Sequence, residues 1–278
     1  METHTSDGRR LTYTELGSGP RLVCHPGGPG FSGAYFGDLG GVASARTVVA
    51  VDPAGTGGSD PWTEEAYSLD RRADDLDELR AALGEEQLDL LGHSAGGFVA
   101  IRYATRHPER VGRLVLVGTF AHFDALRAER DAFLARKESE PEFAGAVAAA
   151  RERMSAGDLP PERKHELLLR SFPLYLKRLT PAARAFAEEV ARGDPPDIRT
   201  LDSFNAQVGG FDLRPELGRI DAPALVVHSD AELERAGQRE LLAGLPNATA
   251  AEISDAGHFP WIEQPERFRD VVLEFLSA

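Results

Sequence analysis

Short apolar runs alternate along the chain with segments of helical periodicity, and this alternation limits the possible folds more than any other feature. Apolar residues recur at helical spacing in two clear stretches, 69–83 and 268–276. The apolar runs are expected to be strands, and they cover residues 10–16, 21–25, 46–52, 87–93, 113–119, 224–229 and 249–254. Strands that alternate with helices predict an α/β fold, in which a mostly parallel, doubly wound sheet has helices on both faces.

A different character marks the segment from about Ala121 to Gly210. Strand-like runs are missing there, Ala, Arg, Glu and Leu dominate, and breaks occur at "SEPE", "GDLPPE" and "GDPPD". Because this segment separates two expected strands, it is interpreted as a helical insertion. The sequence therefore predicts a helical cap of residues 121–210 over one edge of a core that comprises residues 1–120 and 211–278.

Composition excludes several classes of partner. The formal net charge is -14, and 31 basic residues are interspersed among 45 acidic ones, so contact with nucleic acid or an anionic membrane is not expected. The single Cys24 cannot form an internal disulfide, and no Cys/His spacing resembles a zinc site, so neither a metal nor a cofactor is expected. The first twenty residues lack the apolar stretch of a signal peptide, which predicts a cytoplasmic protein. The sequence does not indicate an oligomeric state.

The string Gly92-His93-Ser94-Ala95-Gly96 lies between the apolar run that ends at residue 93 and a helix expected to stop near Pro108. A serine on such a strand–turn–helix junction adopts a strained backbone, and the glycines two residues away avoid clashes with the neighbouring strand and helix. The first free N–H groups of the helix stabilise an oxyanion formed above the serine. The pattern predicts that Ser94 is a nucleophile.

A serine hydroxyl needs a base, and the base needs an acid that holds it in the correct tautomer. His258 in "SDAGHFPWIEQPE" follows the last expected strand, where open α/β sheets build their sites. Three acids, Asp230, Glu232 and Glu234, follow the strand 224–229 and precede His258, which is the chain order expected for a hydrolase triad. The residues themselves leave open which of these acids faces the histidine.

Several aromatic side chains surround these candidates in the sequence. Each one taken singly is better explained by core packing, but together they indicate an apolar acyl or leaving-group pocket under the cap. The predicted pocket residues, with two neighbouring histidines, are His25, Phe31, Tyr35, Trp62, His93, Phe259 and Trp261.

Five segments in order resemble the α/β-hydrolase superfamily over nearly the whole chain: "HPGGPGF" at 25–31, "VDPAGTGGSD" at 51–60, "LLGHSAGG" at 90–97, "HPERVGRLVLVGT" at 107–119 and "GHFPWIEQPERF" at 257–268. Within the superfamily, the runs 27–30 and 52–59 look most like the proline iminopeptidases. The resemblance implies the α/β-hydrolase fold and a cofactor-independent serine hydrolase that forms an acyl-enzyme. The implied substrate is a small ester, an amide or a short peptide with a free N-terminus.

The resemblance also implies a role for each site residue. Ser94 would be the nucleophile, His258 the general base and acid, and the backbone N–H groups of Gly28 and Ala95 the oxyanion hole. The family's spacing after the pair at 228–229 makes Glu232 the triad acid, whereas counting back from His258 favours Asp230.

One departure from the family concerns the carboxylates with which its aminopeptidases hold the substrate's free amine. At the matching positions the chain has Ser203 and Leu233, and only Asp202 or Glu234 could replace them. A buried ammonium without carboxylates carries a large desolvation cost. This departure favours an alternative, an esterase or lactonase of small molecules without free-amine recognition. A further alternative is a non-hydrolytic protein that binds a ligand or guides a cyclisation on the same scaffold.

Overall fold

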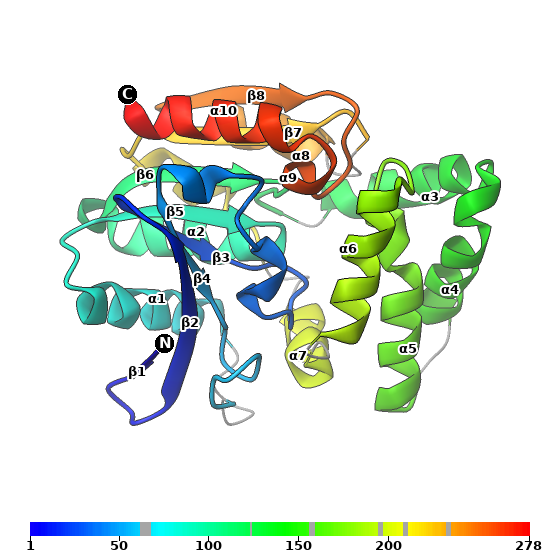
Figure 1. Ribbon diagram of the computed structural model, residues 1–278, viewed down its shortest axis with the longest axis horizontal. Helices are drawn as coiled ribbons and strands as arrows, with labels where there is room; N and C mark the ends of the chain where they lie inside the picture. The colour runs from blue at the N-terminus through cyan, green and yellow to red at the C-terminus, as the bar shows by residue number, and fades with distance from the viewer. Residues whose placement is uncertain (62–67, 123, 156–158, 194–196, 208–210, 232–234) are drawn as a thin grey trace.

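A computed structural model describes residues 1–61, 68–122, 124–155, 159–193, 197–207, 211–231 and 235–278. Its described strands form one eight-stranded sheet in the order β1-β2-β4-β3-β5-β6-β7-β8 (Figure 1). The strands are β1 (Glu2–His4), β2 (Arg10–Gly17), β3 (Arg21–His25), β4 (Thr47–Val51), β5 (Leu88–His93), β6 (Val111–Val117), β7 (Ala224–Ser229) and β8 (Ala248–Ile253). All neighbours from β4 to β8 pair in parallel, and β2 is antiparallel to both β1 and β4. The predicted α/β fold with a mostly parallel sheet is confirmed. Among the described strands, only β1 was not predicted, because its three residues carry no apolar pattern.

Strand alternation divides the core into two layers. On one face, Val23, Leu90 and Leu116 pack under α1 (Leu69–Leu83), α2 (Ala95–Arg106) and α8 (Arg235–Gly244). On the other face, Leu22 and Leu91 pack under α10 (Pro265–Ser277) and the short turns between β3 and β4. Successive strand residues point to opposite faces, so each apolar run supplies both layers at once.

The pairing of β3 with β5 brings two loops together. Val23 lies opposite Leu90, and His25 lies opposite Gly92. Because the strands are parallel, both end at the same edge of the sheet. The loop after His25 and the turn at Ser94 are therefore neighbours.

A helical insertion lies between β6 and β7, as predicted, and covers one end of the sheet (Figure 1). Its described helices are α3 (Asp124–Glu138), α4 (Ala144–Ser155), α5 (Pro161–Ser171), α6 (Pro181–Arg192) and α7 (Ile198–Gln207), with the 3-10 turns η5 (Pro141–Phe143) and η6 (Phe172–Tyr175). The three sequence breaks separate α3 from α4, α4 from α5, and α6 from α7. Proline at the first position of α5 and of α6 suits a helix start, because the missing N–H would have no helical partner there.

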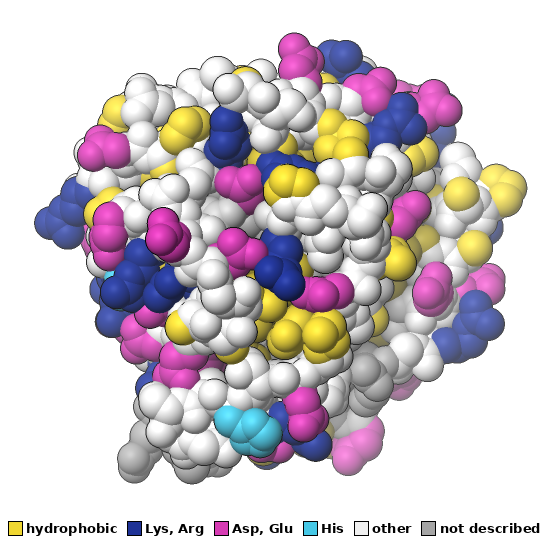
Figure 2. Space-filling view, turned by 60° about the vertical axis from the view of Figure 1, so that its left-hand side comes forward, with side chains coloured by type: hydrophobic (Ala, Val, Ile, Leu, Met, Phe, Trp, Pro, Cys, Tyr) yellow, Lys and Arg dark blue, Asp and Glu magenta, His cyan; other side chains and the backbone are white. Residues whose placement is uncertain are grey.

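Acidic and basic side chains are interspersed on the surface shown in Figure 2. Several arginines lie in ion pairs, such as Arg102 with Glu216 at 2.8 Å and Arg46 with Asp89 at 2.7 Å. Among the helices that the structure describes, none combines the length and apolar character required to cross a bilayer.

Candidate active site

Ser94 lies at the junction of β5 and α2 with φ 54° and ψ -123°. A positive φ is strained for a residue with a Cβ and persists only where the surroundings hold it. Here the Ser94 N–H donates to the Val117 carbonyl at 2.9 Å, and the Ser94 carbonyl accepts from the Gly97 N–H at 2.9 Å. The neighbouring strand and the first helical turn therefore hold the serine in the sharp turn that the sequence predicts.

Close backbone approach explains the glycines around this turn. A Cβ at Gly92 would lie 2.7 Å from the Gly97 Cα, and one at Gly96 would overlap the carbonyl oxygens of His25 and Pro26. A Cβ at Gly27 would lie 2.6 Å from the Ser94 Cβ. The loop after β3 thus lies directly against the serine, and Gly28 and Ala95 line the same cavity as Ser94.

A chain of hydrogen bonds connects this loop to the serine turn and to the histidine loop. The Gly27 N–H donates to the Tyr35 hydroxyl oxygen at 2.6 Å, and that hydroxyl is 2.8 Å from His93 Nδ1. His93 Nε2 is 2.9 Å from the His258 carbonyl, which can only accept. His93 therefore donates from Nε2, and in the neutral ring Nδ1 accepts the Tyr35 O–H.

The surroundings of His93 keep that ring neutral. Burial, together with repulsion from His258, holds the pKa of His93 well below its usual value. His93 thus connects two loops and is not placed to exchange protons at neutral pH.

His258 lies in the loop between β8 and α9 (Pro260–Glu263) and is 6% exposed. Its backbone N–H donates to the Tyr175 carbonyl of η6 at 2.7 Å, so the cap contacts the histidine loop directly. His258 and Ser94 face the same small cavity of about 30 Å³. The structure therefore brings together the two residues that the sequence singled out from segments 164 positions apart.

The two candidate acids, Asp230 and Glu232, both follow β7 in the chain. Glu232 lies outside the described residues. Asp230 follows β7, where its carboxylate accepts from Lys177 Nζ at 3.1 Å and from the Ala256 N–H at 3.3 Å. The carboxylate of Asp230 is thus bonded to groups other than the His258 ring.

Of the predicted pocket residues, Phe31, Tyr35, His93 and Phe259 line the small cavity beside Ser94. The structure places His25 and Trp261 elsewhere. His25 is the last residue of β3 and is buried under the loop that follows, with Nδ1 2.9 Å from the Pro26 carbonyl.

Trp261 is 1% exposed and stacks on Tyr35 with ring centroids 6.1 Å apart, one layer behind the cavity wall. Its ring lies edge-on to that of Phe259, with centroids 5.4 Å apart, so Phe259 separates it from the cavity. Trp62 lies outside the described residues.

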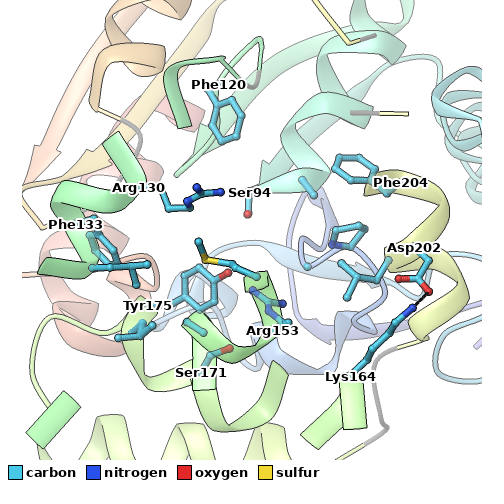
Figure 3. A pocket seen from close by; sticks show the side chains of 18 of the residues that line it. Ser94, Phe120, Arg130, Phe133, Arg153, Lys164, Ser171, Tyr175, Asp202 and Phe204 are labelled. Atoms are coloured by element: carbon cyan, nitrogen blue, oxygen red, sulfur yellow. Dashed lines mark hydrogen bonds and ion pairs between the residues drawn. The ribbon is translucent and has the colours of Figure 1, made fainter. Parts of the chain in front are cut away.

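A larger cavity of about 540 Å³ opens over Ser94 between the sheet and the cap (Figure 3). Sequence reasoning missed most of its walls, which come from the cap. The missed residues include Arg130 of α3, Arg153 of α4, Lys164 of α5 and Phe204 of α7, whereas the sequence indicated Asp202 of α7 only as a possible partner of a free amine. A helical pattern identifies which residues are apolar, but not which edge of a cap helix faces the core, so no local signal marked them.

The cavity walls bear on free-amine recognition. Asp202, one possible substitute for the missing glutamates, is paired with Lys164 at 2.9 Å. Ser203 accepts a hydrogen bond from the Gln207 side chain at 3.0 Å, whereas Leu233 and Glu234 lie outside the described residues. Within the described ranges, no three His, Cys, Asp or Glu side chains are grouped to hold a metal ion.

A family model described as the alpha/beta hydrolase fold matches residues 20–265 of the chain. The chain belongs to the α/β-hydrolase family. A pimeloyl-[acyl-carrier protein] methyl ester esterase from Aeromonas hydrophila is 30% identical over 96% of this α/β-hydrolase and 99% of its own length. A 2-hydroxy-6-oxo-6-phenylhexa-2,4-dienoate hydrolase from Comamonas testosteroni is 25% identical over 96% of this chain and 91% of its own.

The resemblance to proline iminopeptidases holds at the level of the fold. A proline iminopeptidase structure from Mycobacterium smegmatis superposes with a TM-score of 0.74, covering 100% of this α/β-hydrolase and 97% of that chain at 20% identity. Sequence identity this low supports a shared fold but gives no evidence of a shared substrate specificity. The chain is a hydrolase of the α/β-hydrolase family, and the esterase alternative has better support than the peptidase interpretation.

Proposed function

We propose that this α/β-hydrolase cleaves small-molecule esters through an acyl-enzyme, with Ser94 as nucleophile and His258 as general base and acid. The observation that carries the proposal is the strained Ser94 turn, pressed against the Gly27–Gly28 loop and facing a cavity that His258 also lines. Two backbone N–H groups, those of Gly28 and Ala95, are proposed to stabilise the oxyanion. The acyl-enzyme mechanism needs no metal or cofactor.

In the first half-reaction, the Ser94 Oγ bonds to the ester carbonyl carbon while its proton moves to His258, and the carbonyl electron pair moves onto oxygen. Collapse of this tetrahedral intermediate breaks the ester C–O bond, and His258 gives the proton to the departing alcohol. Water then repeats the sequence on the acyl-enzyme and releases the carboxylic acid. Each half-reaction returns His258 to its starting form.

The chemistry of the cavity favours an ester over a peptide with a free amine. Its described walls carry Arg130, Arg153 and Lys164, and the carboxylate of Asp202 is already paired. These cations would repel an ammonium group. The methyl ester esterase similar to this chain acts on an ester according to its name, which agrees with the proposal.

We infer that Glu232 is the triad acid. Asp230 is engaged with Lys177 and the Ala256 N–H, so its carboxylate already has partners. The family spacing after residues 228–229 also favours Glu232, whereas the count back from His258 favours Asp230. The role of Glu232 would be to hold the imidazole of His258 in the tautomer that accepts the serine proton.

A substrate panel with matched variants tests the proposal. We expect the wild-type protein to hydrolyse p-nitrophenyl acyl esters faster than prolyl or other aminoacyl arylamides. Replacing Ser94 by Ala should lower kcat by at least about 10³-fold, because the covalent step is lost. The control Ser139→Ala removes an exposed cap hydroxyl bonded to Arg136 and should keep wild-type activity.

Three outcomes of that panel would count against the proposal. Undiminished ester hydrolysis by Ser94→Ala would refute the nucleophile, and a preference for prolyl arylamides would restore the peptidase interpretation. For the acid, Glu232→Ala should lose far more activity than Asp230→Ala, and the reverse order would move the role to Asp230.

A further inference from the structure

Positive charge gathers in the cavity over Ser94, although the chain as a whole carries a formal charge of -14. Three consecutive cap helices contribute a cation each: Arg130 from α3, Arg153 from α4 and Lys164 from α5 (Figure 3). Among the described residues that line the cavity, Asp202 is the one carboxylate. The described cavity wall therefore carries a net positive charge, whereas the whole chain carries a net negative charge.

These three cations differ in how strongly each is paired with a carboxylate of the protein. Lys164 is 2.9 Å from Asp202, which Figure 3 marks with a dashed line. Arg130 is 3.3 Å from Asp131, whose side chain is 81% exposed, so this pair is screened by water and weak. Arg153 forms no ion pair with a carboxylate in the part of the chain that the structure describes. Among the three cations, its guanidinium is therefore the one most available to bind an anionic substrate group.

The position of Arg153 suits recognition of an anion. The side chain is half-buried on α4 and lines the same cavity as the buried apolar residues Leu134 and Leu174. A guanidinium presents a planar fork of N–H donors that matches a carboxylate, and such charge-assisted bonds are stronger where water is partly excluded. Elsewhere on the protein, arginines such as Arg46 and Arg102 satisfy that fork with Asp or Glu.

We propose that the cavity selects esters that also carry a carboxylate, and that Arg153 binds this carboxylate with support from Arg130. The inference rests on the proposed ester hydrolysis at Ser94 and names the substrate class of that site. In such a substrate, the ester carbonyl lies at Ser94 and the free carboxylate extends toward the cap. Half-esters of dicarboxylic acids are the simplest compounds with this chemistry.

Binding to an inactive variant tests the proposal without relying on turnover. In the Ser94→Ala protein, isothermal titration compares the monomethyl esters of C4 to C8 dicarboxylic acids with the corresponding dimethyl esters. We expect at least one monomethyl ester to bind about 10- to 100-fold tighter than its dimethyl partner, as is typical of a charge-assisted bond. Adding Arg153→Met should abolish that difference while keeping the apolar stem of the side chain.

The matched control is Arg151→Met, also on α4. Arg151 is 53% exposed, pairs with Glu138 at 2.6 Å and is not part of the cavity wall. The preference for the monomethyl ester should survive this substitution and should weaken as salt is added. Equal affinity for the two esters, or an equal loss of preference in both arginine variants, would overturn the proposed carboxylate site.

Turnover by the active protein separates this proposal from the previous one. If the wild-type protein hydrolyses the dimethyl esters at the same rate as their half-esters, ester hydrolysis stands and the carboxylate preference is refuted. If neither ester is hydrolysed but the half-ester binds through Arg153, the carboxylate site stands and the proposed hydrolysis is refuted. Selective binding with faster hydrolysis of the half-ester supports both.

Discussion

At the scale of single residues, the site depends on positions where a side chain must be absent. Gly96 lies in the first turn of α2, where a Cβ would overlap the carbonyl oxygens of His25 and Pro26. Those carbonyls end β3 and cannot move without shifting the loop that contacts Ser94. The glycine is thus required by contact between two chain segments that are distant in sequence, and helix propensity has no part in it.

Two Gly-to-Ala substitutions separate the effect of steric contact from that of helix propensity. Gly96→Ala should lower the free energy of unfolding by about 1–3 kcal/mol through overpacking and should reduce kcat, because the oxyanion loop is displaced. Gly145→Ala is the control: Gly145 is in α4 and a Cβ there meets nothing within 4 Å. It should stabilise the protein by about 0.5–1 kcal/mol. Urea unfolding and ester turnover measure both, and equal effects would contradict the steric explanation.

At the scale of elements, one short helix connects the cap to the histidine loop. Glu263 ends α9, and its carboxylate accepts from the Gly257 N–H at 2.7 Å and from the Lys177 N–H at 2.8 Å. Lys137 of α3 holds the same cap segment, donating to the Leu176 carbonyl at 2.8 Å. Burial raises the pKa of Glu263, although the N–H donors oppose the shift. The residue before His258 is thereby connected to the cap through a single carboxylate.

Glu263→Gln should weaken this connection. The amide keeps one acceptor oxygen but directs an NH2 group at the second N–H, which leaves a buried donor unpaired and costs about 1–3 kcal/mol. Because His258 is the adjacent loop residue, we expect kcat to fall more than KM rises. Glu266→Gln, in the exposed first turn of α10, should stay within about 0.5 kcal/mol of wild type. Identical unfolding and kinetic behaviour of the two variants would exclude the positioning role.

At the scale of the whole molecule, buried histidines make folding sensitive to acid. His25 is 4% exposed, and burial together with repulsion from Arg72 lowers its pKa to about 3 from the usual 6.5. Below pH 6.5 the unfolded chain takes up a proton at this position that the folded protein does not accept until about pH 3. Stability therefore falls as the pH drops through this window. His93 acts in the same direction.

We expect His25 to account for about 2 kcal/mol of the stability lost between pH 7.5 and pH 5, from the distance between pH 5 and the unfolded pKa. The free energy of urea unfolding is measured at both pH values for wild type and for His25→Asn. The loss between the two pH values should be smaller in the variant, whatever its stability at pH 7.5. Exposed His4→Gln serves as the control, and an unchanged loss in His25→Asn would contradict the assignment.

Helices α1, α2 and α10, most of the described strands and the serine turn were predictable because they depend on local patterns. Short apolar runs predicted seven of the eight described strands, and the glycines around Ser94 indicated its sharp turn. Chain order brought His258 into consideration, because the ends of parallel strands meet at one edge. These inferences use contacts between near neighbours or a general rule of sheet topology.

The sequence by itself thus determined the α/β fold, the helical insertion and the candidates Ser94 and His258. Only the tertiary structure decided that His93 connects two loops, that Asp230 is engaged with Lys177, and that Arg153 lines the cavity over Ser94. The reason is physical: local sequence controls backbone conformation, whereas a side chain's partners depend on how distant elements pack. The cap helices contain many arginines of similar appearance in the sequence, and packing alone selects which of them face the serine.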